Sequence, residues 1–218
     1  MRKMKFGFLL AFAVLILVAT VSAALPTSLV ATTSTPYGTT SYWDVNVNSI
    51  TPASGSDISI KEYAGWCADS KTGLGSGSHT FEVYSSLAPA SIPTQVVMSW
   101  SAVNWILNNK GNADMYTVQA ALWHFDGGSH TWGTVNQADY DALVAGGDAA
   151  IASNFVPGDG QVYAVILYQR GTQPIVIEVP VPTIPSPEFP TLAAPIGMLI
   201  GIVGAAQYIK TRKEYAET

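Results

Sequence analysis

The chain has 218 residues, of which only 11% are charged, and its formal net charge is −5. Basic residues gather at the two ends, so the segment between the terminal apolar stretches has four basic residues against thirteen acidic ones, a net charge of −9. This negative field disfavours nucleic acid and anionic lipid as partners. Few charges together with many glycine and aromatic residues are more typical of a β-rich exported surface protein than of a cytosolic enzyme.

The N-terminus has the layout of a secretory signal. Three basic residues precede an apolar stretch at residues 6–21, and small residues follow where a signal peptidase cleaves. We therefore expect residues 1–23 to be a signal peptide that is cleaved after Ala23. An uncleaved N-terminal anchor is the alternative, although the apolar stretch is short for a membrane span. In both cases the predicted main domain, residues 24–180, lies outside the cell.

The first part of the main domain has the periodicity of β-strands. Trp43, Val45 and Val47 alternate with polar residues, as the residues of a half-buried strand do. The Ser/Thr-rich stretch before them, residues 27–41, is either an O-glycosylated lead or a loose edge strand. Three further strands are predicted at residues 58–60, 65–69 and 79–84, with a glycine-rich connection at residues 71–78.

The period then lengthens to that of α-helices before strands return. Apolar residues at helical spacing predict three helices: one over residues 96–107 that ends at Gly111, one that begins after a cap at Asn112 or Asp114, and one from about Gln137 to the Gly146-Gly147 pair or beyond. Residues 162–168 and 175–181 predict a closing hairpin. The order of strands, helices and strands predicts an α+β fold, a β-sandwich or β-barrel with a helical insertion.

The C-terminal part predicts attachment to a membrane. It divides into a Pro-rich linker at residues 181–191, an apolar transmembrane segment at residues 192–209 and a basic cytoplasmic tail at residues 210–218. Pro187-Glu188-Phe189 followed by one membrane segment and a basic end resembles the PEF-CTERM sorting tail of archaeal surface proteins. That resemblance implies an archaeosortase as a processing partner. A plain single-pass anchor is the alternative, and both place the domain at the cell surface.

Cys67 is the only cysteine, so the chain cannot form an intramolecular disulfide. On an exported protein such a thiol is buried and inert, paired between molecules, or committed to chemistry. Gln119 lies at the margin of the apolar face of the second predicted helix, where an unpaired carboxamide costs about 1–3 kcal/mol. If Cys67 ends a strand beneath that helix, its sulfur can attack the Gln119 carboxamide carbon, expel ammonia and leave a thioester that acylates an amine.

The residues around this pair carry a family resemblance. Trp66-Cys67 and Val118-Gln119-Ala120-Ala121-Leu122-Trp123 resemble the Cys and Gln motifs of the thioester domains at the tips of bacterial surface adhesins and pili, over roughly residues 60–170. The resemblance implies an internal thioester between Cys67 and Gln119 that is used for covalent adhesion. Family members often have Tyr before the Cys and Thr before the Gln, where this chain has Trp66 and Val118.

Three neighbouring residues are predicted to assist the thioester. We expect Trp66 and Trp123 to exclude water from the bond, and His124 to act as a general base in proton transfer. The partner implied is an unidentified surface ligand with a nucleophilic amine. No cofactor is needed, and because each acylation consumes the bond, the protein is expected to be a single-use reagent rather than an enzyme.

Other functions use some of the same residues. Cys67, His124 and an acid such as Asp126 are a conceivable thiol hydrolase, although no helix start follows the cysteine. His124, Asp126 and His130 are conceivable metal ligands, but their spacing matches no strong pattern. A third alternative is a non-covalent surface-coat or binding module, in which Cys67 is a buried small hydrophobe or its crosslink is only a structural staple.

Overall fold

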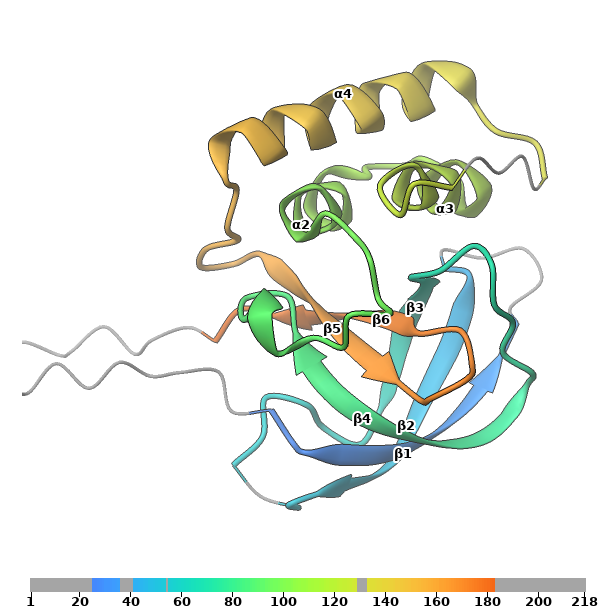
Figure 1. The fold of residues 1–218 in the computed structure, drawn as a ribbon, viewed down its shortest axis with the longest axis vertical. Coiled ribbons are helices and arrows are strands. Elements are labelled where there is room, and N and C mark those ends of the chain that lie inside the picture. The colour runs from blue at the N-terminus through green and yellow to red at the C-terminus, as the bar shows by residue number, and fades with distance from the viewer. Residues whose placement is uncertain (1–24, 36–40, 54, 129–132, 183–218) are drawn as a thin grey trace, which may run out of the picture. The chain divides into compact units, whose positions relative to one another are not determined.

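The structure, a computed structural model, describes residues 25–35, 41–53, 55–128 and 133–182. Among these residues, six antiparallel strands close into a barrel in the order β1-β2-β3-β6-β5-β4, and three α-helices form a layer on one side of it (Figure 1). The strands are β1 (Ser28–Ser34), β2 (Trp43–Thr51), β3 (Glu62–Cys67), β4 (Gly77–Ser85), β5 (Val162–Tyr168) and β6 (Ile175–Pro180); the helices are η1 (Pro89–Ser91), α2 (Trp100–Asn109), α3 (Met115–His124) and α4 (Gln137–Ser153).

This architecture is the β-barrel form of the predicted fold, with the helices inserted between β4 and β5. The predicted signal peptide at residues 1–23, the motif at residues 187–189 and the transmembrane segment at residues 192–209 lie outside the described residues. Within the described part of the chain, no helix combines the length and the hydropathy needed to cross a membrane.

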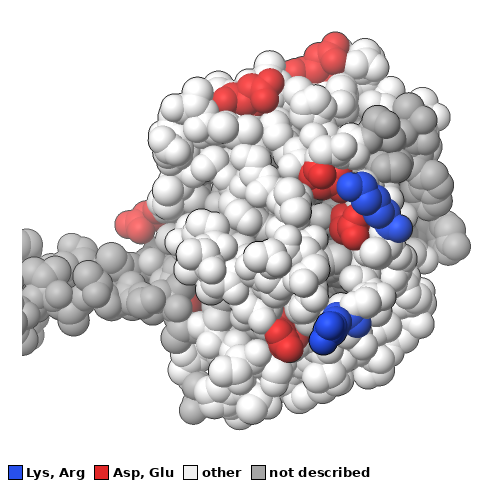
Figure 2. Space-filling model, in the orientation of Figure 1, with Lys and Arg blue, Asp and Glu red and all other residues white. Residues whose placement is uncertain are grey.

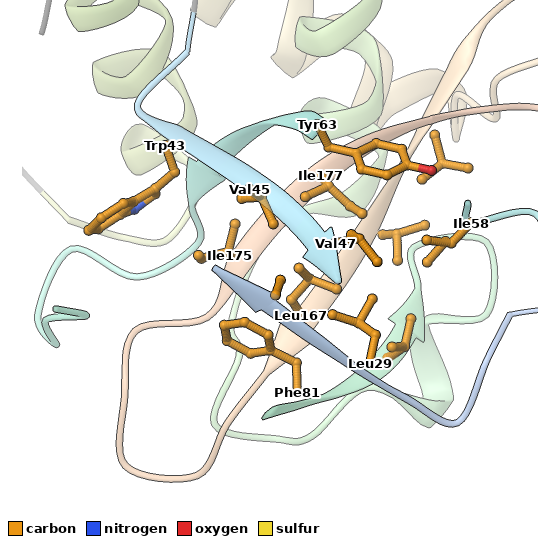
Figure 3. Close-up of a cluster of buried hydrophobic side chains, with 14 of the residues drawn as sticks. Leu29, Trp43, Val45, Val47, Ile58, Tyr63, Phe81, Leu167, Ile175 and Ile177 are labelled. Atoms are coloured by element: carbon orange, nitrogen blue, oxygen red, sulfur yellow. The ribbon is translucent and has the colours of Figure 1, made fainter. Parts of the chain in front are cut away.

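Alternation along the strands fills the barrel. One face of each strand points inward, and these side chains form a continuous apolar cluster, part of which is drawn in Figure 3. Within the stretch at residues 27–41, residues 28–34 form strand β1, but the prediction of an edge strand is corrected. β1 is not an edge, because it pairs with β2 on one side and with β4 on the other.

The strand predicted at residues 58–60 is wrong. Ile58 is buried and closes one end of the apolar cluster, whereas Ile60 is 65% exposed. Local hydrogen bonds replace a strand ladder here: Ile58 N donates to Ser56 Oγ at 3.0 Å, and Ser59 N donates to the Tyr63 hydroxyl at 2.9 Å. Side chains that satisfy nearby backbone groups in this way stabilise turns in place of extended structure.

The helices form two tiers above the barrel. α2 contacts β5 and α3 contacts β3, while α4 lies across both α2 and α3 (Figure 1). α2 begins at Trp100, later than predicted, because Val96 is buried through a turn in which its N–H donates to Pro93 O. α3 begins at the predicted cap, where the Asp114 side chain accepts a hydrogen bond from Thr117 N at 3.0 Å.

The Gly146-Gly147 pair does not end the third helix, since α4 continues to Ser153. The two glycines are the points of closest helix packing. A Cβ at Gly146 would lie 2.0 Å from the Trp105 ring, and one at Gly147 would lie 2.5 Å from the Phe125 ring. The pair therefore marks close contacts of α4 with α2 and with the end of α3.

The face of the molecule in Figure 2 carries few, scattered charges, as the low charged content predicts.

Gly65 in β3 is a second point of close packing, inside the barrel. A Cβ there would lie 2.6 Å from Val45 Cγ2, 3.0 Å from Trp43 Cβ and 3.2 Å from Ile175 Cγ2. These atoms belong to the strands on both sides of β3, so neither strand can move away without breaking the ladder.

We expect Gly65→Ala to lower the free energy of unfolding by about 1–3 kcal/mol, because the added methyl group overpacks the barrel. Gly73→Ala is the matched control, since a Cβ at Gly73 meets nothing within 4 Å. Urea denaturation of both variants measures the difference. Equal stability of the two variants would show that the barrel accommodates the methyl group.

Candidate functional site

Cys67 is the last residue of β3, and its side chain is fully buried in the barrel cluster. On one side, Cys67 is paired with Ile175 of β6. On the other side, the ladder with β2 ends at the pair Trp43 and Gly65, one rung before Cys67. The backbone N–H and C=O of Cys67 therefore point past the start of β2, toward α3.

The Gln119 carboxamide occupies the position of the missing rung. Cys67 N donates to Gln119 Oε1 at 2.8 Å, and Gln119 Nε2 donates to Cys67 O at 2.9 Å. Gln119 is 1% exposed, so both hydrogen bonds lie away from water. The carboxamide is thus held by two contacts against the one residue whose sulfur is predicted to attack it.

The Cys67 sulfur has a hydrogen-bond donor of its own. Trp43 Nε1 donates to Cys67 Sγ at 3.1 Å, within the buried cluster. Burial raises the pKa of the Cys67 thiol far above its ordinary value; the Trp43 hydrogen bond opposes this shift, and the charge of Asp69 adds to it. The thiol is therefore neutral at neutral pH, and its proton has to leave during any attack on the carboxamide.

Three aromatic side chains pack together in or against the buried cluster that contains Cys67, and we call them the aromatic cover: Tyr42, Trp43 and Trp123. The Tyr42 ring meets Trp43 and Trp123 edge to face, with centroid distances of 5.7 and 5.9 Å. Burial raises the pKa of Tyr42 to about 12, with further contributions from the charges of Cys67 and Tyr116. Trp123 is 7% exposed and belongs to the same buried cluster as Cys67.

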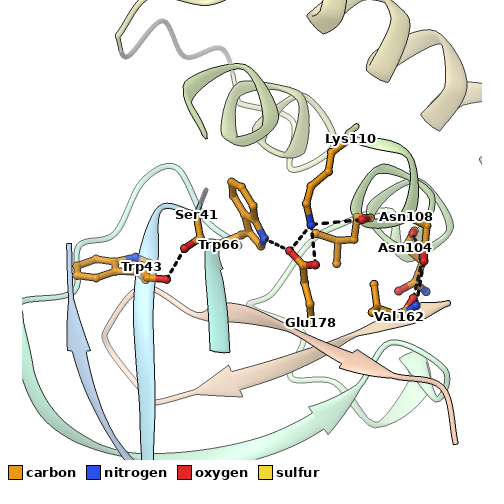
Figure 4. Close-up of polar contacts among 9 residues, drawn as sticks. Ser41, Trp43, Trp66, Asn104, Asn108, Lys110, Val162 and Glu178 are labelled. Atoms are coloured by element: carbon orange, nitrogen blue, oxygen red, sulfur yellow. Dashed lines mark hydrogen bonds and ion pairs between the residues drawn. The ribbon is translucent and has the colours of Figure 1, made fainter. Parts of the chain in front are cut away.

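Trp66 does not cover the sulfur. Successive side chains of a strand point to opposite faces, so Trp66 lies in the cluster between barrel and helices while Cys67 lies inside the barrel. Trp66 Nε1 donates to Glu178 Oε1 at 2.7 Å, and Glu178 accepts an ion pair from Lys110 at 2.5 Å (Figure 4). Trp66 thereby links β3 to Glu178 of β6, a structural role away from the sulfur that differs from the predicted one.

His124 is also placed away from the sulfur. It lies five residues after Gln119, about 140° around the helix from it, and its side chain is exposed. Its Nδ1 is 3.2 Å from the Tyr140 hydroxyl of α4, and its ring packs on Phe125. The structure therefore does not place His124 as a general base at Cys67.

Asp126 has a structural role. Its carboxylate accepts hydrogen bonds from Ser70 N at 2.8 Å and Gly128 N at 2.5 Å, which tie the loop after β3 to the end of α3. The described residues thus do not assemble Cys67, His124 and Asp126 into a hydrolase site. Among them no group of three or more His, Cys, Asp or Glu residues is arranged to hold a metal ion, and His130 lies outside the described residues.

Comparison with solved structures finds weak likenesses. The chain is similar to the N-terminal domain of the Streptococcus pyogenes pilus tip adhesin Cpa, with a TM-score of 0.42 and 14% identity over 75% of this chain and 98% of that chain. It is also similar to the N-terminal thioester domain of the fibronectin-binding protein SfbI from Streptococcus pyogenes, with a TM-score of 0.39 and 14% identity over 75% of this chain and 100% of that chain. No protein-family model and no curated protein matches the sequence.

The carboxamide pairing leads to a pH-dependent expectation for Gln119→Glu, made in a Cys67→Ala background so that no thioester forms. The new carboxyl has to protonate to donate to Cys67 O, so its pKa in the folded protein is raised above the ordinary value of about 4.3. At pH values below the ordinary pKa, the double variant is about as stable as Cys67→Ala alone. As the pH rises through the raised pKa, it loses stability, by about 1–3 kcal/mol.

The free energy of unfolding of both proteins, measured from pH 4 to pH 8, tests this expectation. A constant difference across this range would contradict the pairing between the carboxamide and the Cys67 carbonyl.

Proposed function

We propose that this domain forms an internal thioester between Cys67 and Gln119 and uses it to attach covalently to an amine on a surface ligand. The observation that carries the proposal is the pair of buried hydrogen bonds that hold the Gln119 carboxamide against Cys67. The motif resemblance and the burial of the sulfur under the aromatic cover support it.

The contacts match the needs of thioester formation. When the Cys67 sulfur attacks the carboxamide carbon, negative charge develops on Gln119 Oε1, which already accepts the Cys67 N–H at 2.8 Å. A preoriented donor at such an oxygen stabilises the transition state. The C–N bond then breaks, the thiol proton passes to Nε2, and ammonia leaves. The Cys67 carbonyl, which accepts from Nε2 at 2.9 Å, holds this leaving group in place.

Attachment reverses the roles of sulfur and nitrogen. An unprotonated amine attacks the acyl carbon, a C–N bond forms, the C–S bond breaks, and a proton from the amine returns to the sulfur. The product is a substituted Gln119 amide and a free Cys67 thiol. Until an amine arrives, burial and the aromatic cover protect the thioester from water. The net charge of −9 on the segment between the terminal apolar stretches favours the approach of cationic amines such as lysine side chains.

We propose further that the signal peptide predicted at residues 1–23 directs export of the domain. The segment predicted at residues 192–209 then anchors it at the cell surface. The motif at residues 187–189 would then be the site that an archaeosortase recognises. These segments lie outside the described residues, so this part of the proposal is supported by the sequence alone.

A second function is favoured by a specific observation. The two hydrogen bonds of Gln119 already complete the open rung of β3, so the pair, crosslinked or only hydrogen-bonded, could act as a structural staple in a non-covalent surface module. The two functions differ in reactivity, because a staple resists small amines whereas an attachment site reacts with them.

Intact mass spectrometry of the full-length chain in detergent, with and without methylamine, tests the proposal. We expect the wild type to be lighter than its sequence by one ammonia and then to gain one methylamine at residue 119. Cys67→Ala and Gln119→Ala should do neither. Gln173→Ala is the matched control, since Gln173 is a second buried glutamine, bonded to Asp69 O beside the site, and this variant should behave as wild type.

Two results would contradict the proposal. A wild type of full sequence mass with a titratable thiol after unfolding excludes the thioester. A wild type that lacks ammonia but does not take up methylamine excludes covalent attachment and favours the staple.

A further inference from the structure

Trp43 makes an uncommon hydrogen bond at the proposed site. Its indole N–H can only donate a hydrogen bond, and it donates to Cys67 Sγ at 3.1 Å. Trp43 is only 3% exposed, so this N–H has no access to bulk water. An uncharged sulfur is a weak acceptor, so this pairing satisfies the buried indole poorly unless the sulfur carries negative charge. Charge of that kind develops on the sulfur when a thioester C–S bond breaks.

We propose that Trp43 is a catalytic residue whose indole N–H stabilises the Cys67 sulfur as it leaves the acyl carbon. This inference rests on the proposed function. In the intact thioester the sulfur is nearly neutral, and the indole N–H contributes little. As the amine nitrogen bonds to the acyl carbon, the electron pair of the C–S bond moves onto the sulfur, and the N–H···S contact becomes charge-assisted. The proton released by the amine then completes the thiol.

The interaction accelerates the reaction because it strengthens only in the transition state. By microscopic reversibility the same donor assists thioester formation, where the sulfur attacks as it loses its proton. Trp43 thus acts on the sulfur, and the Cys67 N–H acts on the oxygen of the same reacting group.

Several contacts fix the indole in position. Trp43 begins β2 and pairs with Gly65; a Cβ on Gly65 would lie 3.0 Å from Trp43 Cβ, so the glycine leaves room for the Trp43 side chain. Ser41 Oγ donates to Trp43 O at 3.0 Å and holds the start of the strand (Figure 4). The Tyr42 ring packs edge to face against the indole. A donor held by backbone pairing and packing needs no reorganisation when charge develops on the sulfur.

The test compares Trp43→Phe with the matched control Trp66→Phe in the full-length chain. Both variants lose a buried indole N–H, but the donor of Trp66 goes to Glu178 instead of sulfur. Intact mass followed over time gives the rate of methylamine uptake by the thioester. We expect Trp43→Phe to react at least about tenfold more slowly than wild type, and Trp66→Phe to stay within about threefold.

A second variant separates hydrogen bonding from packing and remains informative if Trp43→Phe does not fold. Benzothienylalanine at position 43 keeps the two fused rings but replaces the N–H by sulfur. We expect its methylamine uptake to be as slow as that of Trp43→Phe.

The outcomes distinguish the two proposals. If the wild type lacks ammonia but the position-43 variants react at the wild-type rate, the catalytic role of Trp43 is wrong and the thioester stands. The same conclusion follows if Trp43→Phe and Trp66→Phe slow the reaction equally. If the wild type has its full sequence mass, the proposed function fails first, and the inference on Trp43 fails with it.

Discussion

The pairing of the Gln119 carboxamide with the backbone of Cys67 is the contact on which the rest of the site depends. The ladder between β2 and β3 ends before Cys67, and the Gln119 side chain makes the two backbone hydrogen bonds that a further residue of β2 would otherwise make. Because the carboxamide has to reach this strand end, α3 is held over β3 with its Gln119 face toward the barrel. That orientation also brings Trp123, one turn later on the same face, into the cover above the sulfur.

β3 serves two cores because its side chains alternate. Trp66 points to the layer between barrel and helices and is held there by Glu178 and Lys110, while Cys67 points into the barrel and meets Trp43. The half-buried ion pair and the indole hydrogen bond hold the strand against the end of α2. The reacting sulfur therefore faces the barrel interior, away from the ion pair that packs on the other face of its strand.

Periodicity predicted most elements and their order, and the Cys and Gln motifs predicted the partners that the structure brings together. The contact of Trp43 with the sulfur was not predictable, because it depends on the register that sets Trp43 opposite Gly65. The alternation of only two residues at 58–60 could not distinguish a strand from a turn. The wrong role for His124 was avoidable, because five residues along a helix turn a side chain away from Gln119.

A high-resolution crystal structure of the protein tests the central claim most directly, through the electron density between Cys67 Sγ and the Gln119 carboxamide carbon. The account predicts continuous density at bonding distance, no nitrogen at the Nε2 position, and an acyl oxygen that still accepts the Cys67 N–H. Separate density for a thiol and an intact carboxamide, hydrogen-bonded to the Cys67 carbonyl in every molecule of the crystal, would contradict it.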